Sequence, residues 1–321
     1  MSDSDYRWEP VDPLGAVLHG LRMTGTLYCQ SELSAPWGFA LPALPGCLML
    51  HAVTCGRARL SVLGKEAVEL GPGELALVPH GTGHTLSDSP GAPTPSFFDL
   101  DRHEFSARYE TLRHGGGGAR TALVCAVVRC DHPASGFLIQ SLPQIIHVSG
   151  WGTRGVSEAA GAAEWIHSTL RLMDAEARAL QPGGETLLTR LADALLVQAV
   201  RVWLASASES QVGWLSALRD PRVGPALAAV HRNPGRRWTV EALAEVAALS
   251  RSAFSERFTA LVGEPPIRYL TRWRMAVAQS LLVEDGLTVG EVASRLGYES
   301  ETAFSRAFKR IHGIPPGSAS P

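Results

Sequence analysis

The cysteines are the residues whose chemistry could set the function of the first half of the chain. They are Cys29, Cys47, Cys55, Cys125 and Cys130. An odd number argues against a framework of structural disulfides, so these thiols are free to sense oxidants, to bind a metal or to pack in a core. A sensor thiol must be accessible and partly ionised, whereas a buried neutral cysteine acts as a small apolar residue.

Two histidines add a second kind of chemistry. His84 closes the segment GPGELALVPHGTGHTL, in which Gly73, Pro79, Gly81 and His84 have the order G-x5-P-x-G-x2-H. This order resembles the second conserved motif of cupins, in which glycines make tight turns and the histidine points into a β-barrel. His51, in GCLMLHAV, lies near the position of the first cupin motif. The usual H-x-H pair and downstream glutamate are missing there, so the resemblance implies an incomplete metal site.

A metal remains one of two interpretations of these histidines. Zinc or iron needs three or four nitrogen, oxygen or sulfur ligands. His51, His84 and one cysteine, Cys125 or Cys55, could supply three of them, and zinc or iron would then be the cofactor. In the other interpretation both histidines are hydrogen-bonded residues of the barrel. A cupin oxygenase or isomerase fused to a DNA-binding module is an alternative function, and the incomplete ligand set counts against it.

The second half of the chain contains an internal repeat, which is its most informative feature. AFSERF begins at Ala253 and AFSRAF at Ala303, and each is followed by a glycine and then by Pro-Pro. A short helical segment precedes each copy, LAEVAALS in the first and VASRLGYES in the second. Each copy therefore has the spacing of a helix-turn-helix, with Gly297 suited to the second turn.

The two copies predict equivalent buried and exposed faces. Phe254 and Phe258 fall at i and i+4 on one helix face, and Phe304 and Phe308 repeat them. The opposite faces carry Arg251, Ser252, Ser255 and Glu256 in the first copy, and Glu301, Thr302, Ser305, Arg306, Lys309 and Arg310 in the second. A polar, partly basic helix face backed by an aromatic core fits the major groove of DNA.

Residues 221–316 resemble the DNA-binding domain of AraC/XylS-type transcriptional regulators. The motifs that carry the resemblance are LAEVAALSRSAFSERFTALVGEPPIRYL and VASRLGYESETAFSRAFKRIHGIPP. It implies two helix-turn-helix units, joined by a long helix, that read adjacent major grooves of double-stranded operator DNA. It implies base contacts from Ser252, Ser255, Glu256, Glu301, Thr302, Ser305 and Arg306. It implies phosphate contacts, which fix the register, from Arg251, Arg257, Lys309 and Arg310.

The first half resembles a subgroup of the same family that carries a cupin sensor domain. The segments YCQSELSAPWGFALP, PGELALVPHGTGHTLSD and ALVCAVV with LIQSLPQIIHV carry this resemblance. The subgroup includes a reactive-chlorine-responsive activator in which oxidation of cysteines switches DNA binding. The match implies an activator with Cys29 and Cys125 as the redox pair and Cys130 as a resolving partner. A regulator switched instead by a ligand in the barrel, such as an apolar effector among Trp37, Phe39 and Leu50, is the alternative.

The length of the chain and the distribution of its charge both favour two domains of different character. The 321 residues favour two domains, and no run of about 18 apolar residues predicts a membrane span. The acidic N-terminus has no apolar signal segment, which favours the cytoplasm. The net charge of −2 conceals an asymmetry, because residues 219–321 hold 14 Lys and Arg against 10 Asp and Glu. A basic C-terminal third on an acidic remainder is typical of a DNA-binding module.

The expected fold is α+β and multidomain. A cupin-like β-barrel with flanking helices is predicted over residues 1–150, a helical linker over 151–218, and an all-α double helix-turn-helix domain over 219–321. Strands are predicted in GCLMLHAV, ARLSVLG, ELALVP, TALVCAVV and GFLIQSL, and residues 87–120 are predicted as a loop whose GGGG is a flexible linker or hairpin tip. Helices are predicted near 157–180 and 185–206, and then near 221–232, 239–248, 251–262, 266–284, 288–296 and 300–312. The first helix pair is expected to be partly buried against the barrel and, as a second use, to form a homodimer, and RNA polymerase is a further candidate partner.

Overall fold

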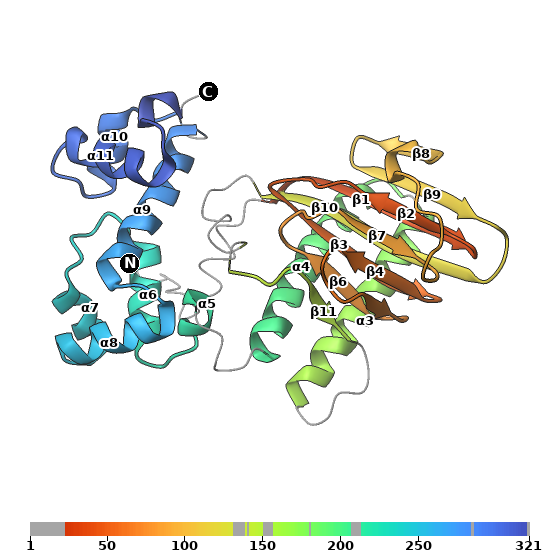
Figure 1. Cartoon of the computed structure of the whole chain (residues 1–321), viewed down its shortest axis with the longest axis horizontal. Coiled ribbons are helices and arrows are strands. Elements are labelled where there is room, and N and C mark those ends of the chain that lie inside the picture. Colours follow the sequence, from red (N-terminus) through yellow and green to blue (C-terminus); the bar gives the residue numbers. More distant parts are fainter. Residues whose placement is uncertain are drawn as a thin grey trace, which may run out of the picture. The chain divides into compact units, whose positions relative to one another are not determined.

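The computed structural model describes residues 23–130, 139, 141–149, 157–179, 181–206, 213–283 and 286–319. The chain divides into two compact units. One, called the sheet unit here, contains Met23–Asp131 and Leu142–Ser206. The other, called the helical unit, contains Ala207–Pro321 and two shorter segments. Figure 1 shows strands in the first and only helices in the second.

Two β-sheets build the sheet unit. The seven-stranded sheet has the order β11-β6-β3-β10-β1-β9-β8 and the four-stranded sheet has the order β2-β7-β4-β5. The strands of the larger sheet are β1 (Met23–Ser34), β3 (Cys47–Cys55), β6 (Leu75–Val78), β8 (Arg102–Ser106), β9 (Tyr109–Gly115), β10 (Arg120–Cys130) and β11 (Ile146–Val148). Those of the smaller sheet are β2 (Gly38–Leu41), β4 (Ala58–Val62), β5 (Val68–Leu70) and β7 (His84–Ser87).

The larger sheet is covered on both faces, and its central strands are apolar for that reason. Strand β3 is buried from Cys47 to Val53. Its side chains at Met49 and Val53 join the core between the sheets, together with residues of β1, β10 and the smaller sheet. Helices α3 (Ser157–Ala179) and α4 (Gly184–Ser206) pack on each other and on the outer face of this sheet, against β1, β3 and β11. Both predicted helices are thereby confirmed.

The prediction of a loop over residues 87–120 was wrong in its second half. This segment contains the short 3-10 helix η1 (Phe97–Asp99) and strands β8 and β9. Strand β9 runs parallel to β1 and β8 is the edge of the sheet. The sequence of β9, YETLRHG, lacks an apolar run because Glu110, rather than an aliphatic residue, points into the barrel beside Leu112.

The GGGG run is not a hairpin tip. It joins β9 to β10, which lie on either side of β1 and do not pair. The chain therefore crosses closely over the end of β1. A Cβ on Gly115 would lie 1.8 Å from the carbonyl oxygen of Ser34, and one on Gly118 would lie 2.6 Å from that of Ala35. Glycine is required there because no side chain fits.

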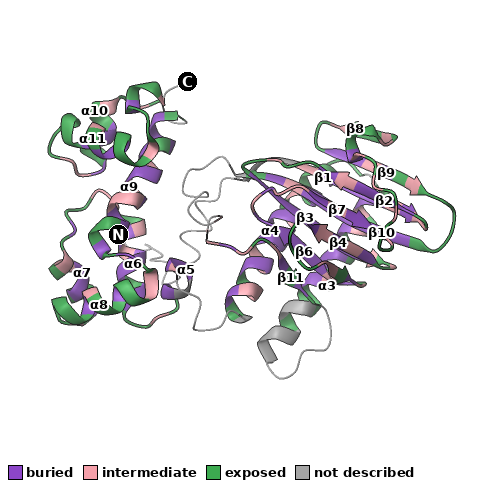
Figure 2. Ribbon diagram, in the orientation of Figure 1, coloured by how far each residue is buried: buried purple, intermediate pink, exposed green. Residues whose placement is uncertain are grey.

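The helical unit confirms all six helices predicted beyond residue 220, to within two residues at each end. They are α6 (Val223–Arg232), α7 (Val240–Val246), α8 (Arg251–Val262), α9 (Pro266–Val283), α10 (Val289–Arg295) and α11 (Glu301–His312), preceded by α5 (Trp214–Ala217) and followed by the 3-10 helix η2 (Pro316–Ser318). Helix α9 connects two helix pairs, α7 with α8 and α10 with α11. Figure 2 shows the buried residues turned inward in each pair.

Candidate DNA-reading helices and buried thiol row

The two candidate recognition helices, α8 and α11, are built from the same local signals. Each begins after a serine whose hydroxyl accepts a hydrogen bond from a backbone amide, Ser250 from Ala253 at 3.3 Å and Ser300 from Ala303 at 3.2 Å. Each ends at a glycine in the left-handed region, with φ of 88° at Gly263 and 78° at Gly313. The repeat in sequence is therefore a repeat in structure.

The turns that precede these helices are also equivalent. In the first unit the amide of Leu249 donates to the carbonyl of Ala244 at 3.0 Å, and in the second Tyr298 donates to Ala293 at 2.9 Å. The second turn has Gly297 at φ 73°, as its sequence predicts. A Cβ at this glycine would lie only 2.1 Å from the carbonyl oxygen of Gly235, so the position also allows a close backbone contact.

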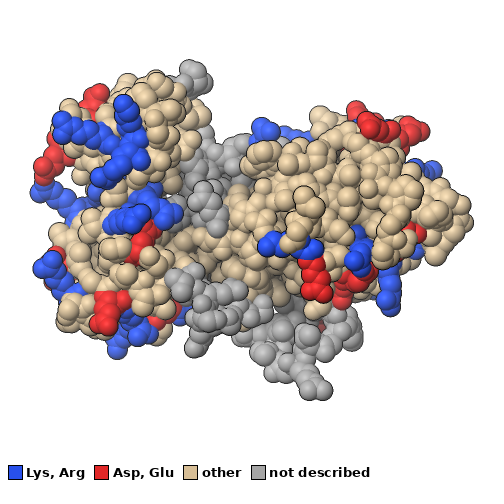
Figure 3. Space-filling model, in the orientation of Figure 1, with Lys and Arg blue, Asp and Glu red and all other residues tan. Residues whose placement is uncertain are grey.

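The exposure pattern repeats along both helices. All four predicted phenylalanines are buried, and Phe254 and Phe304 have no exposed surface. Ser255 and Ser305 are half-buried, and the other nine predicted DNA contacts are exposed: Arg251, Ser252, Glu256, Arg257, Glu301, Thr302, Arg306, Lys309 and Arg310. Figure 3 shows many Lys and Arg side chains over the helical unit, with acidic ones among them. Each helix thus presents one polar row away from its aromatic core.

Two of the predicted phosphate contacts lie in ion pairs. Arg257 forms three hydrogen bonds to the carboxylate of Asp220, the shortest of 2.6 Å. Asp220 also accepts backbone hydrogen bonds at the start of α6, and its pKa is lowered by these bonds although burial opposes the shift. Arg251 pairs with Glu241 at 2.9 Å. The position equivalent to Arg257 in α11 is the buried Ala307, so Arg257 lies on the packing side of α8.

The barrel interior brings together residues that the sequence analysis placed in two separate sites. Strand register sets Cys29 of β1 directly opposite Cys125 of β10, and Cys125 opposite His51 of β3. All three are at least 93% shielded from solvent and face the core, as does His84 of the smaller sheet. We call Cys29, Cys125, His51 and His84 the thiol row.

Hydrogen bonds connect three members of the thiol row. His51 Nδ1 lies 3.1 Å from Cys125 Sγ, His51 Nε2 lies 2.7 Å from His84 Nε2, and His84 Nδ1 lies 2.8 Å from the carbonyl oxygen of Thr82. A carbonyl only accepts, so the Nδ1 of a neutral His84 carries the proton and its Nε2 accepts. His51 Nε2 must then donate, and His51 Nδ1 accepts from the thiol of Cys125. All three hydrogen bonds therefore point the same way, in a series that begins at the Cys125 thiol and ends with Nδ1 of His84 donating to the Thr82 carbonyl.

Burial keeps every member of the thiol row neutral. It raises the pKa of Cys29 to about 12 and that of Cys125 well above its usual value. Burial lowers the pKa of His51, with the adjacent His84 adding to the shift, and burial also lowers the pKa of His84. The reduced barrel therefore holds two protonated thiols beside a neutral imidazole pair. Neither thiol has the solvent access or the partial ionisation that the sequence analysis expects of a sensor, so a redox role requires an oxidant that enters the barrel and reacts with a protonated thiol.

A buried ion pair lies on the other side of Cys29. Glu110 of β9 is the register partner of Cys29 and is 2% exposed. Its Oε2 accepts a hydrogen bond of 2.6 Å from Arg102 of β8, whose guanidinium also lies over the rings of Phe97 and Phe98. Its Oε1 has no hydrogen-bond partner among the described residues. Sequence reasoning missed both residues because it assigned their segment to a loop.

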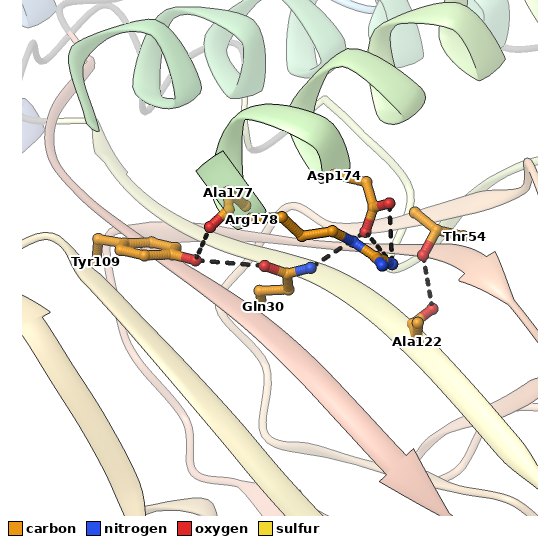
Figure 4. Close-up of polar contacts among 7 residues, drawn as sticks. All are labelled: Gln30, Thr54, Tyr109, Ala122, Asp174, Ala177 and Arg178. Atoms are coloured by element: carbon orange, nitrogen blue, oxygen red, sulfur yellow. Dashed lines mark hydrogen bonds and ion pairs between the residues drawn. The ribbon is translucent and has the colours of Figure 1, made fainter. Parts of the chain in front are cut away.

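Polar contacts on the outer face of the same strands fasten helix α3 to the sheet (Figure 4). The Tyr109 hydroxyl lies 3.3 Å from both Gln30 Oε1 and the Ala177 carbonyl oxygen. Gln30 Nε2 donates to Asp174 Oδ1 at 3.1 Å, and Asp174 also pairs with Arg178. Gln30 directly follows Cys29 on β1, and Tyr109 directly precedes Glu110 on β9. The contacts to α3 and the residues of the barrel interior are therefore connected through the same strand backbones.

The other predicted sensor residues lie elsewhere. The backbone of Cys130 ends β10, but its side chain lies outside the described residues. Cys47 is buried and Cys55 is exposed. Trp37 and Phe39 pack in the core between the sheets, whereas the buried Leu50 is on the opposite face of β3 from His51. The segment GFLIQSL falls mostly outside the described residues.

The thiol row does not have the geometry of a metal centre. Two nitrogens that bind one zinc ion tetrahedrally lie about 3.4 Å apart, given zinc–nitrogen bonds of about 2.1 Å. His51 Nε2 and His84 Nε2 are 2.7 Å apart and share a proton instead. Within the described ranges, no group of three or more His, Cys, Asp or Glu side chains is arranged to hold a metal ion. The arrangement supports proton transfer rather than metal ligation.

Comparisons with known proteins fit both units. A family model described as cupin matches residues 12–205, and one described as helix-turn-helix domain matches residues 243–319. A putative AraC-like transcription regulator of Streptomyces lividans is 34% identical over 96% of this chain and 97% of its own length. The chain belongs to this family of AraC-like regulators with a cupin domain. The α+β fold class and the family resemblance predicted from sequence are confirmed.

Two further relatives extend over nearly the whole regulator. The RCS-specific HTH-type transcriptional activator RclR of Escherichia coli is 29% identical over 96% of each chain. The HTH-type transcriptional regulator AlkR of Acinetobacter baylyi is 28% identical over 94% of this chain and 96% of its own. Relatives named as transcription regulators over this length favour a DNA-binding regulator over an enzyme. In the described part of the regulator, no helix has both the length and the apolar composition needed to cross a membrane.

Proposed function

We propose that this regulator is a sequence-specific, cytoplasmic activator that senses a chlorine-type oxidant through Cys29 and Cys125. One observation carries the proposal: two buried thiols sit opposite each other on neighbouring strands, and one of them donates a hydrogen bond to a neutral imidazole pair. Residues directly opposite in an antiparallel pair have Cβ atoms about 4.5–5.5 Å apart, and a disulfide needs about 3.5–4.5 Å. A small strand adjustment would join them.

The oxidation divides into two balanced steps with hypochlorous acid as the oxidant. Cys125 Sγ attacks chlorine, an S–Cl bond forms and the O–Cl bond breaks. His51 accepts the thiol proton and passes it to the departing hydroxide, which leaves as water. Cys29 Sγ then attacks Cys125 Sγ, the S–S bond forms, chloride leaves, and the thiol proton of Cys29 passes to a nearby base. The two thiols lose two electrons and hypochlorous acid gains them. Cys130 is a further resolving candidate at the end of β10.

Burial supports selectivity for such an oxidant. Most thiol reagents react with the thiolate, which the raised pKa values of Cys29 and Cys125 suppress. A small, uncharged and strongly electrophilic oxidant can enter the barrel and react as the proton leaves to His51. The name of the Escherichia coli relative, an RCS-specific activator, agrees with this selectivity.

Helix α3 is the proposed path from the barrel towards DNA. Movement of β1 on disulfide formation would shift Gln30, and with it the hydrogen bond to Asp174 of α3 and the hydrogen bond from Tyr109, whose hydroxyl also contacts Ala177 of α3. The exposed side chains of Trp165 and Leu172, two turns apart on α3, are proposed as part of a homodimer contact. RNA polymerase remains the proposed partner of an activator. Switching requires that the two states differ in free energy of DNA binding.

The DNA contacts follow from the exposed rows of α8 and α11. Base contacts are proposed from Ser252, Ser255, Glu256, Glu301, Thr302, Ser305 and Arg306. Phosphate contacts are proposed from Arg251, Lys309 and Arg310, with Arg257 available only if it leaves Asp220. The first helix offers small side chains and an acid, and the second offers basic residues, so most of the readout is expected from α11.

The deciding experiment compares operator binding before and after oxidation. The full-length regulator is treated with one equivalent of hypochlorous acid, its disulfides are mapped by mass spectrometry, and binding is measured at fixed salt. A Cys29–Cys125 disulfide and a changed affinity are expected, both lost in Cys29→Ser and Cys125→Ser and retained in the exposed control Cys55→Ser. If the two serine variants still respond fully, the thiol proposal is wrong.

A further inference from the structure

We infer that Glu110 is the proton acceptor for Cys29 in the second oxidation step, and that Arg102 holds the Glu110 carboxylate in place until then. The inference rests on the proposed redox function, because it concerns how the resolving thiol loses its proton. Cys29 must give up that proton as the S–S bond forms and chloride leaves. The Cys29 thiol lies 3.6 Å from the hydroxyl of Ser31, which is too weak a base to keep a proton, so inside a closed barrel the acceptor has to be another protein group near the sulfur.

Geometry selects Glu110 for this role. It is the register partner of Cys29 on β9, both face the interior, and the pair is shielded from water. One carboxylate oxygen is held by Arg102, and the other has no hydrogen-bond partner in the part of the chain that is described. A buried carboxylate oxygen without a partner carries a large desolvation cost, which a proton would relieve. The imidazole pair serves Cys125 on the opposite side.

Arg102 sets when Glu110 can act. Burial raises the pKa of Glu110, while the charge and hydrogen bond of Arg102 oppose the rise. The titratable and charged groups that face Glu110 are Arg102 and Glu104 from β8 and Cys29 from β1. Once Glu110 is protonated, Arg102 loses its counter-charge. The edge strand β8 and the rings of Phe97 and Phe98 then lose the ion pair that holds them to β9.

The test follows the fate of Cys125 after one equivalent of hypochlorous acid. In Glu110→Gln, formation of the Cys29–Cys125 disulfide should slow by at least tenfold at pH 7, and sulfenic acid, formed when water displaces chloride from the S–Cl intermediate, should accumulate at Cys125 instead. The control Glu32→Gln removes a carboxylate from the outer face of the same β1 strand, where it pairs with Arg113, and should leave the rate unchanged. Far-UV circular dichroism checks that each variant is folded.

A pH profile separates a proton acceptor from a structural ion pair. In Arg102→Gln the carboxyl group remains but loses the charge and hydrogen bond that oppose its raised pKa, so the rate should fall at pH 7 and recover as pH rises, whereas Glu110→Gln should stay slow at every pH. A disulfide that forms at the wild-type rate in Glu110→Gln, or a rate in Arg102→Gln that does not recover, overturns the inference and leaves the redox function standing. Absence of the disulfide in the wild type overturns the redox function itself.

A second feature, independent of the thiols, is a pocket rich in arginine between α3 and the sheet. It has a volume of about 190 Å³ and is lined by Thr54, Cys55, Arg120, Ala122, Arg171, Asp174 and Arg178. Asp174 is already engaged by Arg178 and Gln30. Arg120 and Arg171 are exposed and form no ion pair with any described residue, so both guanidinium groups are available to a ligand from solvent.

The structure assigns this pocket to a small dianionic oxygen ligand, of the phosphate or dicarboxylate class. Guanidinium groups bind such oxygens through pairs of parallel hydrogen bonds. The volume is below the 300 Å³ or more typical of drug-sized ligands, which restricts the ligand to a few atoms. Because the lining joins α3 to β3 and β10, the bound anion would hold the helix against the sheet.

Thermal unfolding at constant ionic strength tests this site, with inorganic phosphate and malonate as separate probes against chloride. A saturable rise in Tm is expected for at least one dianion and should be lost in Arg120→Gln with Arg171→Gln. Arg113→Gln, an exposed arginine of β9 outside the pocket, is the control and should behave as wild type. An equal rise with chloride, or an unchanged rise in the double variant, would show a general salt effect and overturn the assignment.

Discussion

His231 shows at the scale of one residue how the helical unit depends on pH. Its Nε2 lies 2.6 Å from the Tyr269 hydroxyl and its ring stacks on Trp273 with centroids 4.1 Å apart. Burial lowers its pKa from 6.5 to about 3. The folded protein therefore excludes a proton that the unfolded chain accepts below pH 6.5. Stability from this group is complete above pH 6.5 and is lost as pH falls towards 3.

We expect acid to destabilise the helical unit through His231, by about 2 kcal/mol at pH 5 relative to pH 7.5. Urea unfolding monitored by tryptophan fluorescence measures the free energy of unfolding at both pH values. In His231→Phe the decrease in the free energy of unfolding from pH 7.5 to pH 5 should be smaller than in the wild type by that amount. His51 and His84 have lowered pKa values as well, but they titrate alike in both proteins and cancel in the comparison. Equal losses in the two proteins would contradict the prediction.

At the same scale, residue type alone was informative but incomplete. The sequence singles out Cys29, Cys125, His51 and His84, because thiols and imidazoles have chemistry of their own. It groups His51 and His84 with Cys125 or Cys55 as metal ligands and pairs Cys29 with Cys125, but it could not choose between the cysteines or show the hydrogen bonds, since these depend on strand register across two sheets. Glu110 escaped notice because an inward-facing carboxylate interrupts the apolar pattern that marks a strand.

At the scale of elements, the duplicated helix-turn-helix allows a matched test of its tightest turn. Gly297 and Gly313 both have positive φ, 73° and 78°. A Cβ at Gly297 would also meet the carbonyl oxygen of Gly235 at 2.1 Å, whereas nothing lies within 4 Å of one at Gly313. Gly297→Ala should therefore lower the Tm more than Gly313→Ala, which bears only the backbone strain of about 1 kcal/mol.

Differential scanning calorimetry of the two variants measures this difference directly. A loss for Gly297→Ala that exceeds the loss for Gly313→Ala by at least 1 kcal/mol is expected from backbone displacement at Gly235. Operator binding at a temperature where both variants are folded would report whether the second unit keeps its orientation. If both substitutions lower the stability equally, the backbone at Gly235 can move away from the added Cβ without a loss of stability. The turn would then need glycine only for its positive φ.

The elements of the helical unit were more predictable than those of the sheet unit, for a physical reason. Its helices carry local signals, namely serine caps, glycine stops and apolar residues at helical spacing, and the repeat confirms each signal once more. Strands β8 and β9 have no such support. They are polar, one lies at a sheet edge, and β9 pairs in parallel with β1, which is far from it in the sequence.

At the scale of the whole molecule, the regulator combines a basic helical unit with an acidic sheet unit, and DNA affinity has two components. Phosphate contacts depend strongly on salt and are indifferent to sequence, while base contacts distinguish one operator from another. Arg306 and Lys309 are both exposed on α11, three residues apart, so they provide a matched pair for separating these components.

An operator selected from random-sequence DNA by the full-length regulator makes the test possible. Arg306→Ala should weaken operator binding by about 1–3 kcal/mol and leave binding to random DNA nearly unchanged, because a bidentate contact to guanine is lost. Lys309→Gln should weaken both, and should reduce the slope of log affinity against log salt by about 0.9, because one phosphate contact is lost. Arg113→Gln in the sheet unit is the control. An equal loss on both DNAs for Arg306→Ala would make Arg306 a phosphate contact and shift the readout to Glu301, Thr302 and Ser305.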